Sequence, residues 1–227
     1  MKRKEAIAAI ANAIAALPGE RPQRVAVNGR IASGKTTLAS ELADAVRAQG
    51  RPVLHVGVDG FHNPIAIRYR QGRSSARGYY EDAYDLDAVG RLLLQPLGMK
   101  ANSADGLWSI RTCCFDLDTD MPINEAPEAI VADTVLVVDG SFLLVPKLRS
   151  LWDYVVFLDV DRTIAAMRGA KRDSDRLGGF EPAKTMHEER YQTACDFYIS
   201  ENQPQNYANA IWSNADFERP VLRFRSG

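Results

Sequence analysis

The sequence is poor in cysteine, has no long apolar run and carries almost no net charge. Cysteine occurs only at positions 113, 114 and 195 of the 227 residues, without ligand-spaced pairs, which argues against a zinc site or a disulfide framework. Few cysteines favour a reducing, cytoplasmic setting. The formal net charge is -1, so no general positive field would attract nucleic acid or an anionic membrane.

The first residues imitate a signal peptide, because a basic start is followed by an Ala- and Ile-rich stretch. Glu5 and Asn12 interrupt that stretch, and apolar residues recur at helical spacing up to Leu17. This pattern favours an amphipathic helix over residues 2–17. The longest apolar run is far shorter than the roughly 20 residues of a membrane span, so we expect no membrane partner.

Short apolar runs alternate with helical patterns along the chain. This alternation is typical of βαβ units, and it predicts one α/β domain over residues 1–227, with a parallel five-stranded sheet flanked by helices. In such sheets ligands bind beyond the carboxyl ends of the strands. The expected strands are 25–27, 53–58, 135–138, 154–158 and 210–212, and the main expected helices are 35–49, 87–94 and 181–199.

Residues 29–36 fit the pattern G-x-x-x-x-G-K-[ST] completely. Glycines let backbone N–H groups wrap around phosphates, Lys35 can reach the β and γ oxygens, and the Thr36 hydroxyl can bind Mg²⁺. A chance match is expected in about one chain in a hundred of this length, and here the motif also joins a strand to a helix. The motif predicts a P-loop NTPase fold with ATP and Mg²⁺ as cofactors. The expected nucleotide-binding residues are Gly29, Ala32, Ser33, Gly34, Lys35, Thr36 and Thr37.

Two acidic residues follow expected strands. Asp59, after 53–58, is placed to orient an acceptor hydroxyl and take its proton. Asp139, after 135–138, resembles a Walker B acid that holds Mg²⁺. Asp-Gly is also a common turn pair, so a plain turn is the alternative at both positions. We expect Thr36, Asp139 and Asp59 to surround the metal, and Asp59 and Lys35 to act in catalysis.

A basic segment at about 162–179 is predicted to be a lid. Such a flap can close over the γ-phosphate, exclude water and neutralise developing charge. A solvated helix face is the alternative, since that is the usual fate of a run of charges. The basic residues of the segment are Arg162, Arg168, Lys171, Arg172 and Arg176, and the segment alone leaves open which arginine touches phosphate.

Six segments together resemble the uridine kinase/phosphoribulokinase family of P-loop kinases, specifically its bacterial uridine kinase-like members. The resemblance implies that Asp59 is the catalytic base. It also places the acid after the Walker B strand at Asp139, where family members often carry Glu. It further implies that the lid arginines at the nucleotide are Arg168, Arg172 and Arg176, with Arg172 also acting in catalysis. Acceptor recognition is implied within an insertion at about 61–134, near His62, Tyr79, Tyr80, Arg111 and Asp116. The segments are 27–37 (VNGRIASGKTT), 58–63 (VDGFHN), 78–86 (GYYEDAYDL), 137–144 (VVDGSFLL), 151–161 (LWDYVVFLDVD) and 170–173 (AKRD).

The resemblance implies ATP-dependent phosphorylation of a small-molecule hydroxyl, with the 5′-hydroxyl of uridine or a related nucleoside as the first candidate. The string at 59–62 (DGFH) also resembles pantothenate kinases and bacterial sugar kinases, and His62 could simply pack in a turn. A non-catalytic nucleotide-sensing module is the alternative from another class. A GTPase switch is disfavoured, because the chain has no Asn-Lys-x-Asp string. ATP versus GTP preference and a homo-oligomer are left open.

Overall fold

The computed structural model describes residues 2–101 and 105–225, and within them the central sheet has six strands in the order β10-β9-β8-β1-β7-β2. The five from β9 to β2 are parallel, which confirms the predicted sheet, whereas β10 pairs antiparallel with β9. Sequence reasoning missed β10, a short run of only four residues interrupted by Arg223. The strands are β1 (Gln23–Gly29), β2 (Val53–Gly57), β7 (Val135–Gly140), β8 (Tyr154–Asp159), β9 (Ala210–Ser213) and β10 (Val221–Phe224).

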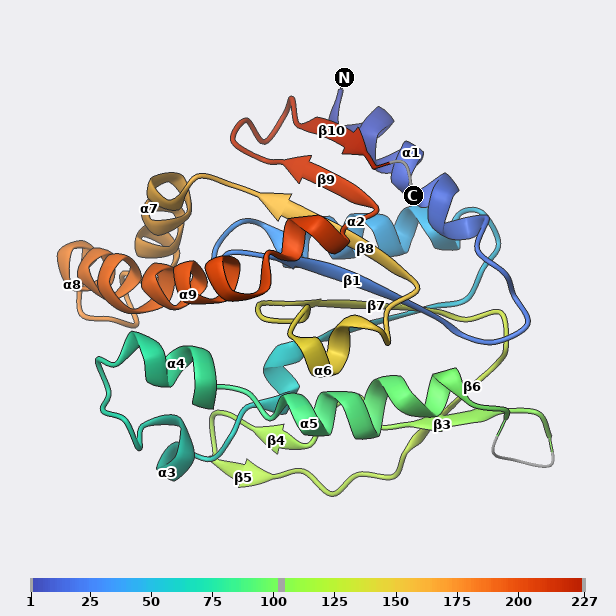
Figure 1. The fold of residues 1–227 in the computed structure, drawn as a ribbon, viewed down its shortest axis with the longest axis horizontal. Helices are drawn as coiled ribbons and strands as arrows, with labels where there is room; N and C mark the ends of the chain where they lie inside the picture. The colour runs from blue at the N-terminus through green and yellow to red at the C-terminus, as the bar shows by residue number, and fades with distance from the viewer. Residues whose placement is uncertain (1, 102–104, 226–227) are drawn as a thin grey trace.

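Helices cover both faces of this sheet (Figure 1). Successive strand side chains point to opposite faces. Accordingly, Val25 and Val27 pack with α1 (Arg3–Ala15) and α2 (Lys35–Arg47), whereas Ala26 belongs to the core on the other face. That second face is covered by α4 (Ala76–Asp82), α5 (Leu86–Ala88), α6 (Pro146–Arg149) and α9 (Gln192–Asn202).

The expected helix at 181–199 is split into α8 (Phe180–Thr185), a π-helical turn (Met186–Tyr191) and α9. The expected lid begins with α7 (Arg162–Asp173), whose first turn is capped by the Asp161 carboxylate at the backbone N–H of Thr163. The expected insertion contains α3 (Ile65–Arg68) and two small antiparallel pairs. These are β3 (Trp108–Ile110) with β6 (Glu128–Ile130), and β4 (Phe115–Asp116) with β5 (Met121–Pro122).

Strand register explains why the two predicted acids meet the P-loop. Val27 of β1 and Gly57 of β2 both lie opposite Asp139 of β7, which separates the two strands. The strands β2 and β7 lie on one side of β1, whereas the later strands β8 and β9 lie on its other side. In parallel sheets, ligands bind at the point where the strand order switches sides in this way. The loop that follows β1, Asp59 and Asp139 therefore share one edge of the sheet.

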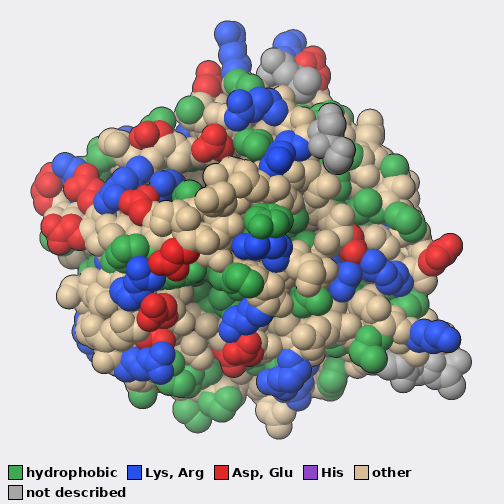
Figure 2. All heavy atoms as spheres, viewed as in Figure 1, with side chains coloured by type: hydrophobic (Ala, Val, Ile, Leu, Met, Phe, Trp, Pro, Cys, Tyr) green, Lys and Arg blue, Asp and Glu red, His purple; other side chains and the backbone are tan. Residues whose placement is uncertain are grey.

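The face of the molecule drawn in Figure 2 carries no large patch of one charge. Figure 2 shows basic and acidic side chains interspersed over one face of the molecule. Among the described residues, no helix is long and apolar enough to cross a membrane.

Candidate active site

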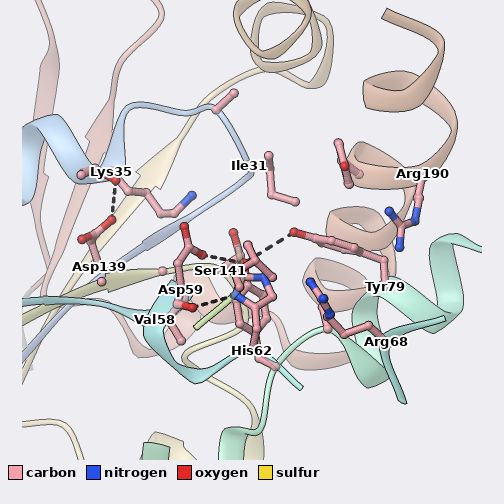
Figure 3. A pocket seen from close by; sticks show the side chains of 18 of the residues that line it. Ile31, Lys35, Val58, Asp59, His62, Arg68, Tyr79, Asp139, Ser141 and Arg190 are labelled. Atoms are coloured by element: carbon pink, nitrogen blue, oxygen red, sulfur yellow. Dashed lines mark hydrogen bonds between the residues drawn. The ribbon is translucent and has the colours of Figure 1, made fainter. Parts of the chain in front are cut away.

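A cavity of about 610 Å³ opens at the carboxyl edge of the sheet. It is lined by the P-loop, by the ends of β2 and β7, by the predicted lid and by the predicted insertion. Figure 3 shows Lys35 and Asp139 on one side, Asp59 and His62 in the middle, and Arg68 and Arg190 on the other side. The predicted residues that it brings together are Ala32, Lys35, Thr36, Asp59, His62, Tyr79, Asp139, Arg172 and Arg176.

The P-loop turns through a left-handed residue at Gly34, whose φ is 95°. A Cβ there would lie 2.8 Å from the Asn214 side-chain nitrogen, so this position requires glycine. Lys35 Nζ donates one hydrogen bond, 2.7 Å long, to the Arg30 carbonyl. Burial lowers the pKa of Lys35. An ammonium group has three donors, so Lys35 can still donate to phosphate oxygens.

Distant elements fix the backbone of the P-loop. Asn214, just after β9, donates from its amide to the Ser33 carbonyl at 2.9 Å, and Gln192 of α9 donates to the Ile31 carbonyl at 3.0 Å. The Ser33 hydroxyl is buried without a hydrogen-bond partner among the described residues. The bonds from Asn214 and Gln192 hold the loop in its folded conformation, so its backbone is already placed to bind phosphate.

Two of the three residues expected to surround magnesium, Thr36 and Asp139, are in contact, whereas Asp59 contacts neither of them in the described structure. The Thr36 hydroxyl donates to Asp139 Oδ2 at 2.5 Å, and His55 Nε2 lies 2.8 Å from Asp139 Oδ1. Among the residues that the structure describes, no cluster of three or more His, Cys, Asp or Glu could hold a metal. Mg²⁺ does not need one, because phosphates and water supply most of its oxygen ligands. One carboxylate and one hydroxyl side by side therefore suit a nucleotide-bound magnesium ion, with His55 fixing the carboxylate.

Asp59 is exposed to the cavity, and two neighbours orient it. Its Oδ1 accepts a hydrogen bond from the Tyr84 hydroxyl at 3.1 Å, and its carbonyl lies 2.8 Å from His62 Nδ1. A carbonyl only accepts, so His62 Nδ1 carries a proton. Burial lowers the pKa of His62 and favours the neutral ring, whose Nε2 is then an acceptor. The site thus presents one open carboxylate beside a polar aromatic wall.

Two lid arginines reach the cavity and share one carboxylate. Asp173 accepts from Arg172 Nε at 2.9 Å, lies 3.5 Å from Arg176 and contacts His187 Nε2 at 2.8 Å. Burial alone would raise the pKa of Asp173, but hydrogen bonds from Arg172 and His187 outweigh it and lower the pKa to about 2. Gly169 makes room for this arrangement, since a Cβ there would lie 2.1 Å from the His187 ring.

Comparison with known proteins agrees with this geometry. No protein-family model matches the chain. The uridine kinase of Leuconostoc citreum (strain KM20) is 24% identical over 195 residues, which cover 85% of this chain and 88% of that protein. The structure of a possible uridine kinase from Bacillus stearothermophilus superposes with a TM-score of 0.69 at 22% identity, over 92% of this chain and 97% of that one. Phosphoribulokinase from Rhodobacter spheroides superposes with a TM-score of 0.58 at 13% identity, over 92% of this chain and 81% of that one.

The chain is thus similar in sequence to proteins named uridine kinase and shares its fold with solved P-loop kinases. The relatives therefore confirm the P-loop kinase fold that the sequence predicted, whereas the roles of individual residues in this kinase-like site stay predictions.

Four side chains predicted for this site do not line the cavity of the described structure. Arg168 donates to the Asn214 carbonyl at 2.8 Å, and the Tyr80 hydroxyl accepts from Asn202 at 2.7 Å. Arg111 donates to Asn124 at 3.0 Å, and Asp116 accepts from the backbone of its own turn. Four further predicted residues belong to the P-loop or to the first turn of α2 but do not line the cavity: Gly29, Ser33, Gly34 and Thr37.

Sequence reasoning overlooked several lining residues of this kinase-like site. Arg68 had a weak signal, since it lies in the Arg- and Tyr-rich segment 61–80. Ser141 directly follows the Asp-Gly pair that ends β7. Arg190 had no local signal, because its place depends on the π-helical turn. The overlooked lining residues include Arg68, Tyr84, Ser141, Arg190 and Tyr191.

Proposed function

We propose that this protein is an ATP-dependent kinase that transfers the γ-phosphate to a hydroxyl group of a small molecule. One observation carries the proposal: Lys35, Thr36, Asp139 and Asp59 line a single cavity at the carboxyl edge of the sheet. Sequence similarity to proteins named uridine kinase supports it. The free cysteines at 113, 114 and 195 fit the cytoplasmic location that we propose with it.

Each group has a definite task in this proposal. The backbone of the P-loop and Lys35 bind the β- and γ-phosphates, while Thr36 and Asp139 hold Mg²⁺. When bound, the ion neutralises charge on the phosphates.

In the transfer itself, the bond from the γ-phosphorus to its bridging oxygen breaks, a bond to the acceptor oxygen forms, and Asp59 receives the hydroxyl proton. Arg172 and Arg176 offer positive charge to the transferring group.

The similarity to uridine kinases makes the 5′-hydroxyl of uridine or a related nucleoside the first acceptor to test. Tyr79 and His62 on the cavity wall support a ring-shaped acceptor, because both offer an aromatic surface and a polar atom. Pantothenate and sugars belong in the same test, since the string at 59–62 resembles kinases for both.

The deciding experiment is an ADP-release assay with purified protein, ATP and Mg²⁺ against nucleosides, pantothenate and sugars. We expect one acceptor to raise ADP release well above the rate with water alone. Tight ATP binding without acceptor-dependent ADP release for any compound would contradict the proposal and favour a nucleotide-sensing module.

A further inference from the structure

Arg190 is an unusual residue in the cavity wall. It is 5% exposed and lies on the π-helical turn Met186–Tyr191, a kind of turn that often occurs at functional sites. Its guanidinium carbon lies 5.3 Å from the ring centre of Tyr69, 4.8 Å from that of Tyr79 and 5.4 Å from that of Tyr191. Within the described residues it has no hydrogen bond or ion pair, and its Nε is buried without a partner.

Other buried arginines of this chain are paired. Arg3 binds the Glu41 carboxylate, Arg24 binds Asp153, and Arg51 binds Asp133. A buried charge without a counter-charge is costly, and aromatic faces offset only part of that cost. The fold thus compensates buried arginines elsewhere and leaves Arg190 facing the cavity uncompensated. This is the state expected of a residue whose partner is a ligand.

A second guanidinium lies beside Arg190. Arg68 also lines the cavity, and its guanidinium carbon lies 5.7 Å from the same Tyr69 ring. Its Nη2 donates to Asp120 at 2.8 Å, but its Nε is buried without a partner among the described residues. Figure 3 shows both arginines next to Tyr79, on the far side of Asp59 from Lys35. This end of the cavity is therefore distinct from the phosphate end.

The charge at this end is not cancelled by its carboxylates. Asp120 faces Arg68, and Asp118 lines the cavity from the turn between β4 and β5. In the described structure neither carboxylate forms a hydrogen bond or ion pair with Arg190, so the donors of Arg190 remain available. A guanidinium presents parallel N–H groups that match the two oxygens of a carboxylate or phosphate.

We propose that Arg190, assisted by Arg68, binds an acid group on the acceptor, whose hydroxyl group lies against Asp59. This inference rests on the proposed kinase function and narrows its substrate class to hydroxy acids or phosphate esters over neutral nucleosides and sugars. Carboxylate and phosphate share the recognition chemistry, so the test must include both.

The test compares acceptors that differ only in charge. ADP release is measured with pantothenate against pantothenol, D-glycerate against glycerol, and fructose 1-phosphate against fructose, with uridine as a neutral nucleoside. We expect the acidic member of at least one pair to be phosphorylated at least 10-fold faster, per unit concentration, than its neutral partner. The carboxylate and phosphate pairs show which acid group is recognised.

The key variant is Arg190→Gln, and Arg223→Gln on the exposed strand β10 is its matched control. Arg190→Gln should raise the KM of the acidic acceptor about 10- to 100-fold, the range for a hydrogen bond to a charged group, and leave the KM of ATP unchanged. Arg190→Lys should recover part of the lost affinity for the acceptor, because lysine keeps the positive charge but lacks the parallel N–H groups of the guanidinium. The control should match the wild type. The melting temperature of Arg190→Gln should equal or exceed that of the wild type, because the contacts with the tyrosine rings offset only part of the cost of the buried charge.

Several results would overturn the inference. They are equal use of neutral and acidic acceptors, an unchanged acceptor KM in Arg190→Gln, or a rise in the KM of ATP instead. A marked fall in melting temperature would assign Arg190 a structural role, and Arg68→Gln would then have to show the same selective rise in acceptor KM for the inference to survive.

A second readout separates this inference from the kinase proposal. Without ATP, thermal shifts with pantothenate, D-glycerate and fructose 1-phosphate are compared in wild type and Arg190→Gln. A shift that is lost in the variant supports the acid site even if no acceptor is turned over, in which case only the kinase proposal fails. Equal shifts, or none, overturn the acid site and leave the kinase proposal standing.

Discussion

The two edges of the central sheet treat their charged groups differently. At the amino edge, Arg21 and Arg24 both donate to Asp153. Arg24 donates two hydrogen bonds, 3.0 and 2.9 Å long, to the Asp153 carboxylate. At the carboxyl edge, Lys35 has one carbonyl partner and the Asp59 carboxylate is open to the cavity. Arg21, Arg24 and Asp153 are thus paired with one another, whereas Lys35 and Asp59 form no ion pair among the described residues.

This difference has a physical basis. Taking charged groups out of water is costly, and pairing repays part of that cost, so removing one partner strands an uncompensated charge inside the protein. An unpaired group at a cavity is costly until a ligand arrives, so the fold keeps such groups only where they serve a function. Substitutions at the amino edge should therefore change stability, and those at the carboxyl edge should change catalysis.

The largest effect is expected at Asp59. Asp59→Asn keeps the size of the side chain but removes its ability to take a proton, so kcat should fall about 10²–10⁴-fold with little change in the KM of ATP. Asp139→Asn should instead raise the Mg²⁺ requirement, because its task is to hold the ion. Steady-state titration of ATP, Mg²⁺ and acceptor separates the two. A wild-type kcat in Asp59→Asn would make Asp59 a turn residue, with the base to be sought within 61–116.

The matched substitution at the amino edge is Asp153→Asn. It strands two arginines, so the free energy of unfolding should fall by about 3 kcal/mol, with kcat unchanged well below the melting temperature. Urea unfolding and the ADP-release assay measure the two quantities. A stable variant with a reduced kcat would break the contrast between the edges.

The pH dependence of stability has a definite sign at this pair. Burial alone would raise the pKa of Asp153, but hydrogen bonds from Arg21 and Arg24 outweigh it and hold the pKa well below its ordinary value. The stabilising contribution is therefore complete above about pH 4 and is lost as the pH falls below that value. Asp153→Asn should remove this part of the acid sensitivity.

A smaller effect is expected at the lid. Arg172 and Arg176 share Asp173, so a bound γ-phosphate would compete for them and order residues 162–179. Hydrogen exchange with and without a non-hydrolysable ATP analogue should show added protection in this segment and little change in β7. The same protection in both states would favour a solvated helix over a lid.

Local patterns predicted the parts of the fold that depend on local chemistry. A few neighbouring residues are enough to indicate a buried strand at β1, β7 and β8 and a phosphate-binding turn at 29–36. The sheet and the phosphate loop could therefore be predicted. Asp59 and Asp139 followed from strand ends, because parallel strands bring their carboxyl ends to one edge. The structure also places His62 and Tyr79 at the cavity, as the family resemblance implied.

Residues that depend on long-range packing could not be predicted. Asn214 reaches Ser33 across 181 positions of sequence, and Arg190 faces the cavity from a π-helical turn that packs beside Tyr69 and α4. Arg111 and Asp116 were chosen for their place in the insertion, yet Arg111 bonds to Asn124 and Asp116 closes a turn beside β5. Sequence proximity does not reveal such partners.

The claim that the carboxyl edge transfers phosphate while the amino edge stabilises the fold is tested most directly at Lys35. The measurement is kcat together with melting temperature for Lys35→Ala, beside the same pair of values for Asp153→Asn. The account predicts that Lys35→Ala loses about 10²–10³-fold or more in kcat, at an unchanged melting temperature. Near-normal turnover in folded Lys35→Ala, together with a loss of turnover in Asp153→Asn, would contradict it.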